Sequence, residues 1–289
     1  MKGIVKYIIE TDYDNLVESL KEVEYGVKVG LIVNYNDTKY EFLLNIKENS
    51  EECICLSSSV ITPERRERFH LRPVFHRLSW EFDQSAIFYN DPTRYAGSTD
   101  EIVNDPRGGW GVGKFDDYFL RNIKDMVIKI VDYYGIAHKN ILFYGSSMGG
   151  FKSLMLGTMV RDSMVLADLP QLNLLNYRTF VENVIDTIYK DYSKEELETI
   201  NYRFSVIDMM KKENYVPDAF INISCRPYDI KSQYSWFINQ LNELVDIEDN
   251  DNNIQLQVRP IPGHYPMSNE LSMEYINRRF AQRKLQTEK

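Results

Sequence analysis

Cysteine is scarce in this sequence. The three cysteines are an odd number, and Cys53 and Cys55 fall within one short apolar segment, which fits neither a disulfide framework nor a zinc site. Basic residues are also in deficit, because 34 Lys and Arg stand against 43 Asp and Glu and give a net charge of −9. That charge argues against a surface for nucleic acid or for an anionic membrane. We therefore expect no metal site and no nucleic-acid partner.

Long hydrophobic runs are missing as well. The first residues reach Glu10 and Asp12 after only a few apolar positions, so we expect no signal peptide, and no later run is long enough to span a membrane. The 43% of hydrophobic and 27% of charged residues are typical of a globular protein with a substantial core. The expectation is a protein without a transmembrane segment in a reducing compartment, most simply the cytoplasm. A homo-oligomer remains open.

Strand-like and helix-like segments alternate along the chain. Two apolar runs flank the polar residues 36–38 and predict a β-hairpin within about 25–47. Further strands are predicted at 51–58, 85–92, 140–145, 163–170, 219–225 and 253–261, and helices at 116–135, 151–160, 232–245 and 268–285. A mostly helical insertion at about 172–214 is expected to form a cap. The pattern predicts one α/β domain over 1–289, with a mostly parallel twisted sheet of about eight strands and helices on both faces.

A serine between glycines follows the predicted strand at 140–145. The segment GSSMG, residues 145–149, fits the pattern G-x-S-x-G and leads into a predicted helix. In that context the central serine occupies a sharp turn, and glycines two positions away let the neighbouring backbones pass. The helix N-terminus there stabilises developing negative charge. Ser147 is therefore predicted to be a nucleophile, the alternative being a glycine-rich turn that only packs a helix on a sheet.

A serine nucleophile needs a base, and the base needs a third group to hold it. Of the four histidines, His264 lies directly after the last predicted strand, in a loop bounded by proline and glycine. That loop belongs at the sheet edge where Ser147 is expected. We predict Asp229, in the loop after the next-to-last strand, as the acid. Asp168, at the end of the strand after the elbow, is the alternative, since either residue can also cap a turn.

The other histidines are weaker candidates. His138 precedes the strand at 140–145, so it should lie at the opposite edge of the sheet. His70 and His76 fall in the early connection at 63–80, a segment that can carry a short helix. A role for either of them on the substrate side is left open.

An acyl-transfer site also needs two backbone N–H groups for the oxyanion. One should belong to Met148, the residue after the nucleophile. The other should come from Ser58 or Ser59, in the loop after the strand at 51–58, unless this run of serines is an ordinary polar turn. Ser146, beside the nucleophile, is a candidate substrate contact.

Trp110 is a second candidate substrate contact. It lies in RGGWGVG, residues 107–113, which is not a dinucleotide site, because Lys114 and Asp116 fall where a last glycine is required and no strand leads into it. We therefore expect no cofactor. The segment is predicted to be a loop that holds Trp110 either near the mouth of the site or packed in the core.

With these residues in place, the sequence resembles the α/β-hydrolase family of serine hydrolases over roughly 25–285. The resemblance rests on the elbow at 145–149, on Gly263-His264 and on the strand order, and it implies a Ser-Asp-His triad of Ser147, Asp229 and His264. An HGGG-type oxyanion stretch is absent, and LSSSV stands in its place. The segments YNDPTRY and GGWGVGKFDD also resemble bacterial members linked to surface polysaccharide and glycoprotein export, including capsule O-acetyltransferases.

Three functions follow as hypotheses. The first is a serine hydrolase that cleaves a carboxylic ester through an acyl-enzyme, with a small molecule or, as the resemblance implies, an acylated glycan as substrate. The second is an O-acyltransferase that uses the same triad to pass the acyl group to a sugar hydroxyl. The third is a non-catalytic scaffold in a secretion or surface-glycan assembly complex. The sequence identifies neither the acyl nor the alcohol part of a substrate.

Overall fold

The computed structural model describes residues 5–59, 77–95, 108–247 and 254–287 of the 289-residue chain. His70, His76 and most of the segment at 63–80 lie outside these residues. Within the described ranges, no helix combines the length and the apolar character needed to cross a bilayer.

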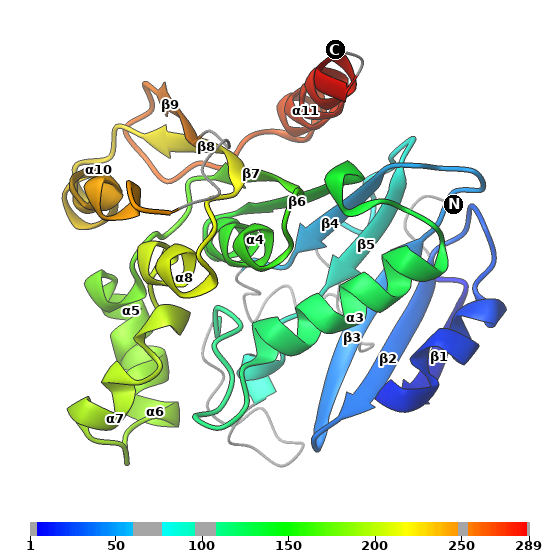
Figure 1. Ribbon diagram of the computed structural model, residues 1–289, viewed down its shortest axis with the longest axis horizontal. Helices are drawn as coiled ribbons and strands as arrows, with labels where there is room; N and C mark the ends of the chain where they lie inside the picture. Colours follow the sequence, from blue (N-terminus) through cyan, green and yellow to red (C-terminus); the bar gives the residue numbers. More distant parts are fainter. Residues whose placement is uncertain (1–4, 60–76, 96–107, 248–253, 288–289) are drawn as a thin grey trace.

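Nine strands of the described chain form one sheet, in the order β1-β2-β3-β5-β4-β6-β7-β8-β9 (Figure 1). The strand β3 runs antiparallel to β2 and β5, and the other neighbouring pairs are parallel. The strands are β1 (Tyr7–Asp12), β2 (Val29–Tyr35), β3 (Thr38–Asn45), β4 (Cys53–Ser57), β5 (Ser85–Tyr89), β6 (Ile141–Ser146), β7 (Met164–Asp168), β8 (Asp218–Ser224) and β9 (Ile254–Arg259). The mostly parallel sheet is the one predicted, with one strand more than expected.

The additional strand is β1, at the edge of the sheet beside β2. Only Ile9 of this strand is buried, because one side of an edge strand has no partner and the segment YIIETD carries two acidic residues. The next two strands form the predicted hairpin. Its turn residues, Asn36 and Asp37, have φ of 49° and 54°, the left-handed conformation that a two-residue type I′ turn requires.

The longer helices agree with the predicted segments. The expected helices at 116–135 and 268–285 are α3 (Phe119–Tyr133) and α11 (Asn269–Thr287). The helix expected at 151–160 is α4 (Met148–Met159), which begins earlier, directly after Ser147. The one expected at 232–245 divides into a π-helical turn (Ile230–Tyr234), α10 (Ser235–Gln240) and a 3-10 turn (Leu241–Leu244). The remaining short helices are α1 (Leu16–Ser19), α5 (Arg178–Phe180), α6 (Asp186–Ile188), α7 (Lys194–Glu198), α8 (Val206–Glu213) and α9 (Pro227–Asp229).

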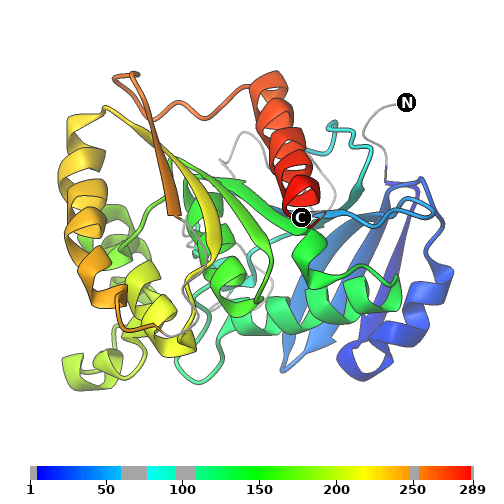
Figure 2. The same cartoon turned by 45° about the horizontal axis from the view of Figure 1, so that its top comes forward.

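Successive side chains along the central strands point to opposite faces and divide the core into two layers. Phe143 and Val165 pack in the layer under α3 and α4, whereas Tyr144 and Leu166 pack in the layer under α11. Figures 1 and 2 show α3, α4 and α8 on one face of the sheet and α11 on the opposite face. Helices therefore cover both faces, as predicted.

The two cysteines of β4 point to the same face. Cys53 and Cys55 both belong to the layer under α3 and α4, and both carry free thiols. Burial raises the pKa of the Cys55 thiol well above its usual value.

The chain between β7 and β8 forms a series of short helices, as predicted for 172–214. Figure 1 shows α5, α6 and α7 grouped below α8. The Tyr189 hydroxyl donates to the carbonyl oxygens of Val112 and Gly113 at 3.2 and 2.9 Å, and Nη1 of Arg203 donates to the carbonyl of Lys114 at 2.7 Å. These contacts fasten the insertion to the loop that contains Trp110.

Candidate active site

Ser147 lies at the junction of β6 and α4 with φ 56° and ψ −123°. A conformation of this kind costs a non-glycine residue about 1–3 kcal/mol, so the surrounding structure must impose it. Close packing does so: a Cβ added to Gly145 would stand 2.4 Å from the carbonyl carbon and oxygen of Gly149. The Ser147 N–H also donates to the carbonyl of Asp168 at 2.8 Å. Ser147 is half-buried between buried neighbours, which presents its hydroxyl at the sheet edge.

Asp229 and His264 meet at the same edge. Asp229 follows β8 and His264 follows β9, and these strands run parallel to β6, so their carboxyl ends lie together. Nδ1 of His264 lies 3.2 Å from Oδ2 of Asp229. The Ser224 hydroxyl donates to the same carboxylate oxygen at 3.4 Å. An Nδ1–H that donates to a carboxylate leaves Nε2 as the basic nitrogen of the imidazole.

Asp168, the alternative acid, has other partners. Its buried carboxylate accepts the backbone N–H of Met267 at 2.8 Å and lies 3.4 Å from Nη1 of Arg259. Burial raises the pKa of the Asp168 carboxyl, although Met267 and Arg259 both lower it. Asp168 thus anchors the loop that carries His264, while Asp229 accepts the hydrogen bond from the imidazole.

Ser147 and His264 are not hydrogen-bonded to each other. Nε2 of His264 is buried and has no hydrogen-bond partner among the described residues. The Ser147 oxygen accepts a hydrogen bond from Nε2 of Gln171 at 3.2 Å. The basic nitrogen and the serine hydroxyl therefore stand at the same edge without a bond between them.

The predicted oxyanion donors differ in availability. Met148 is the first residue of α4, where backbone N–H groups have no acceptor within the helix. The Ser58 N–H donates to the carbonyl of Tyr89 at 3.2 Å, like a hydrogen bond within the sheet. This N–H is therefore not free for an oxyanion, and the prediction of Ser58 as a donor is corrected. No such bond engages the Ser59 amide in the described part of the chain, and Ser59 remains the candidate.

Ser146 is buried and faces the α11 side of the sheet, like Tyr144 two residues before it. Its hydroxyl accepts a hydrogen bond from Nη2 of Arg77 at 2.9 Å. Arg77 also donates to the carbonyl of Ser57 at 3.2 Å, and its guanidinium lies over the rings of Trp80 and Tyr144 at 5.0 and 5.1 Å. The Ser146 hydroxyl, which we predicted as a substrate contact, is therefore already hydrogen-bonded to Arg77.

Trp110 is packed in the core, at 2% exposure, rather than open at a site mouth. Its indole N–H donates to Oε1 of Gln171 at 3.1 Å, and Gln171 contacts Ser147. The ring meets Tyr177 and Phe180 edge-on, with centroids 5.9 and 5.3 Å apart. Gln171 was not predicted. Its only sequence signal is a polar residue directly after Pro170, the last residue of the segment predicted as a strand at 163–170.

A buried ion pair lies behind the elbow. Nζ of Lys152 in α4 lies 3.7 Å from Oδ2 of Asp91, and both side chains are fully buried. Lys152 also donates to Oγ of Ser58 at 3.0 Å, and Asp91 accepts the backbone N–H groups of Thr93 and Gly111 at 3.0 and 2.9 Å. The pair joins three segments, namely the loop that begins at Ser58, the loop that contains Gly111, and helix α4. Its sequence signal is a lone charge in the otherwise uncharged segment MGGFKSLMLGTM.

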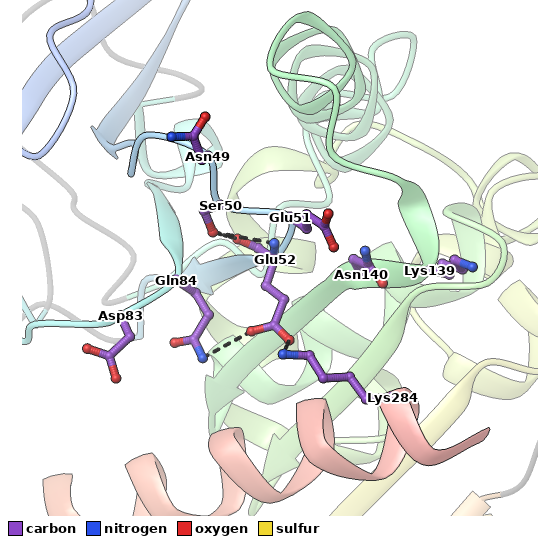
Figure 3. Close-up of a pocket in the computed structure, with 9 residues that line it drawn as sticks. All are labelled: Asn49, Ser50, Glu51, Glu52, Asp83, Gln84, Lys139, Asn140 and Lys284. Carbon is purple, nitrogen blue, oxygen red and sulfur yellow. Dashed lines mark hydrogen bonds and ion pairs between the residues drawn. The ribbon is translucent and has the colours of Figure 1, made fainter. Parts of the chain in front are cut away.

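A polar pocket of about 560 Å³ lies at the other edge of the sheet (Figure 3). Glu52, Gln84 and Asn140, which line it, directly precede β4, β5 and β6, whereas Ser147 follows β6. Glu52 pairs there with Lys284 of α11 at 2.9 Å. His138 lies on this side as well, as predicted, with Nε2 3.0 Å from Asp132. This pocket is separate from the candidate active site.

Replacing one partner of the Asp91–Lys152 pair should destabilise the protein more than replacing both partners together. We expect Asp91→Asn to lower the free energy of unfolding by about 3–5 kcal/mol, because it leaves the Lys152 ammonium buried without its carboxylate. The double variant Asp91→Asn/Lys152→Met should lose less than the sum of the two single variants. Urea unfolding measures all three, with Lys21→Met at the exposed Lys21–Glu18 pair as the neutral control. Additive losses would contradict direct pairing.

No family model matches the sequence, and no curated protein matches it. Solved structures do. A capsule O-acetyltransferase of Neisseria meningitidis serogroup A is similar over 87% of this chain and 96% of its own, with 15% identity and a TM-score of 0.57. An S-formylglutathione hydrolase from Agrobacterium tumefaciens matches over 90% and 96%, with 11% identity and a TM-score of 0.58. Serine hydrolase F of Staphylococcus aureus, described as fluorophosphonate-binding, matches over 90% and 99%, with 10% identity and a TM-score of 0.55. The chain therefore has an α/β-hydrolase fold.

Proposed function

We propose that this protein is a serine hydrolase that cleaves a carboxylic ester through an acyl-enzyme, with Ser147 as nucleophile, His264 as base and Asp229 as acid. The observation that carries the proposal is the hydrogen bond between Asp229 and His264 at the sheet edge where Ser147 occupies a strained turn. That bond leaves Nε2 as the basic nitrogen, and Nε2 has no other partner among the described residues. A rearrangement that brings Nε2 to the hydroxyl completes the triad, as catalytic hydrogen bonds often form only with substrate present.

The reaction has two halves. Ser147 attacks the acyl carbon while its proton passes to Nε2 of His264, and the imidazolium then protonates the departing alcohol. Water attacks the acyl-enzyme in the second half, loses its proton to His264 and releases the acid. The Asp229 carboxylate holds the imidazole in the required tautomer and stabilises its charged form. The Met148 and Ser59 amides are the proposed donors to the oxyanion, each worth about 10²–10³ in kcat in a site of this type.

An O-acyltransferase is the second candidate, and the similarity to a capsule O-acetyltransferase along nearly the whole of that chain favours it. The acyl-enzyme half is the same in both reactions, and the acceptor alone differs. A sugar hydroxyl that outcompetes water takes the acyl group and forms a new ester. An acylated or acceptor glycan is thus the proposed substrate class, with a small acyl ester as the alternative.

Ser147→Ala should remove all measurable esterase activity, a loss of about 10⁶-fold in kcat, because the nucleophilic oxygen is gone. The control is Ser153→Ala, which removes a buried hydroxyl from α4, the helix that follows Ser147, and should remain active. Hydrolysis of p-nitrophenyl acetate and labelling by a fluorophosphonate probe are the measurements. An active Ser147→Ala enzyme would refute the nucleophile, and a wild-type enzyme inert to both reagents would favour the scaffold.

Asp229→Asn should lower kcat by about 10⁴-fold with little change in melting temperature, because the amide favours the wrong imidazole tautomer. Asp168→Asn keeps an acceptor for the Met267 N–H and should cause a much smaller loss. Steady-state kinetics of the two matched variants identify the acid. A larger loss of kcat for Asp168→Asn would reverse the assignment.

The fate of the acyl group separates hydrolysis from transfer. Purified protein is given an acetyl donor, with and without an oligosaccharide acceptor, and mass spectrometry follows acetate and acetylated sugar. As a hydrolase, the protein should release acetate at the same rate with or without acceptor. Acetylated sugar formed by wild-type protein, at the expense of acetate and absent with Ser147→Ala, would replace the hydrolase with the transferase.

A further inference from the structure

Gln171 is the side chain that contacts the hydroxyl of Ser147. Its Nε2 lies 3.2 Å from Ser147 Oγ, and its Oε1 lies 3.1 Å from the indole Nε1 of Trp110. The side chain is 4% exposed, so water does not compete for either end. A buried amide with both ends bound has one orientation, and this one is fixed between a tryptophan and the proposed nucleophile.

Donor chemistry decides which end of the amide faces Ser147. An indole N–H can only donate a hydrogen bond, so the atom opposite Trp110 must be the carbonyl oxygen of Gln171. The NH₂ group is therefore the end that faces Ser147. The serine oxygen accepts this bond, and its own proton is directed away from Gln171.

Trp110 is itself firmly anchored. Its φ is 51°, and Gly111 beside it donates its N–H to the buried Asp91 carboxylate at 2.9 Å. A Cβ on Gly109 would stand 2.3 Å from Cβ of Thr93, and one on Gly111 would stand 2.5 Å from Cγ of Leu120. The glycines of GGWGVG thus allow the loop to pack closely enough to place the indole against Gln171. This packing gives the glycines of the segment a structural role.

Resting on the proposed serine mechanism, we propose that Gln171 is a further catalytic residue and that Trp110 is its positioning residue. In the free enzyme the Gln171 N–H orients the Ser147 hydroxyl, so that its proton is available to Nε2 of His264. The same N–H remains aimed at the serine oxygen throughout the cycle.

The second half-reaction gives this donor its largest effect. Water adds to the acyl carbon and loses a proton to His264, and the bond between that carbon and Ser147 Oγ then breaks. The electron pair of the bond goes to Oγ, which takes the proton from the imidazolium and again becomes a hydroxyl. Negative charge builds on Oγ as the bond breaks, and a hydrogen bond to a charged acceptor is stronger than one to a neutral acceptor.

The test compares two buried glutamines. Gln171→Glu keeps an acceptor for Trp110 but cannot donate to Ser147 as a carboxylate, so kcat should fall about 10- to 100-fold with KM little changed. Gln171→Met, which lacks the donor and adds no charge, should show the same loss. Trp110→Phe should lower kcat less, because the amide stays but loses its fixed orientation.

Gln233→Glu is the matched control. Gln233 is equally buried, and its Oε1 accepts the backbone N–H groups of Leu172 and Asn173 at 2.7 and 3.0 Å, a role that a carboxylate keeps. It should retain kcat. The rates of fluorophosphonate labelling and of deacylation, with the melting temperature of each variant, complete the comparison.

The outcomes are distinct. A loss of kcat in both Gln171 variants, at unchanged KM and melting temperature and with Gln233→Glu active, supports the proposal. Wild-type kcat in Gln171→Met, or an equal loss in Gln233→Glu, overturns it while leaving the serine mechanism intact. Wild-type protein that neither hydrolyses esters nor reacts with the probe removes the proposed function, and this inference with it.

Discussion

The buried carboxylate of Asp91 links three segments that surround the candidate active site. A charge in a dry interior is tolerated only when it is paired and hydrogen-bonded, and Asp91 has both Lys152 and two backbone N–H groups. Through Gly111 it holds the loop of Trp110, and through Lys152 it reaches Ser58, next to the proposed donor Ser59. Asp91 thus connects the loop of Trp110 with the loop that begins at Ser58, although these two loops are far apart in the sequence.

The parallel strands bring the candidate site residues to one edge, and the loops that follow the strands set their contacts. Asp168 ends β7, and Ser147, Asp229 and His264 follow β6, β8 and β9. These four strands are consecutive in the sheet, so one edge gathers residues that are far apart in the chain. What distinguishes them is their partners. Asp168 binds Arg259 and a backbone amide, whereas Asp229 binds the imidazole. Two carboxylates at one edge thus differ in their hydrogen-bond partners, and the fold alone assigns neither of them a function.

Sequence patterns predicted the elements that depend only on residues close together in the chain. The hairpin followed from two apolar runs around Asn36 and Asp37, and the elbow followed from glycines that relieve a clash within five residues. The strand β1 was missed, because its short apolar run, Tyr7-Ile8-Ile9, is followed at once by Glu10-Thr11-Asp12, and an edge strand that buries one residue needs no longer run. Gln171, Asp91 and Lys152 were missed for a different reason. Apart from Thr93, which lies two residues from Asp91, their partners lie 20 to 94 residues away, and nothing in a local pattern reports such a contact. The Ser58 amide was misassigned because its acceptor, Tyr89, belongs to a neighbouring strand.

The thiols of β4 give the molecule an internal reporter. Cys55 lies in the middle of the sheet, on the strand that leads into the serine loop, and both burial and its raised pKa suppress the thiolate that reacts with alkylating agents. Cys225 is only half-buried, so reagents reach it more readily than Cys55. Slow modification at Cys55 therefore reports how often the centre of the sheet opens in the native protein. Its rate is a direct measure of the local stability beneath the proposed oxyanion loop.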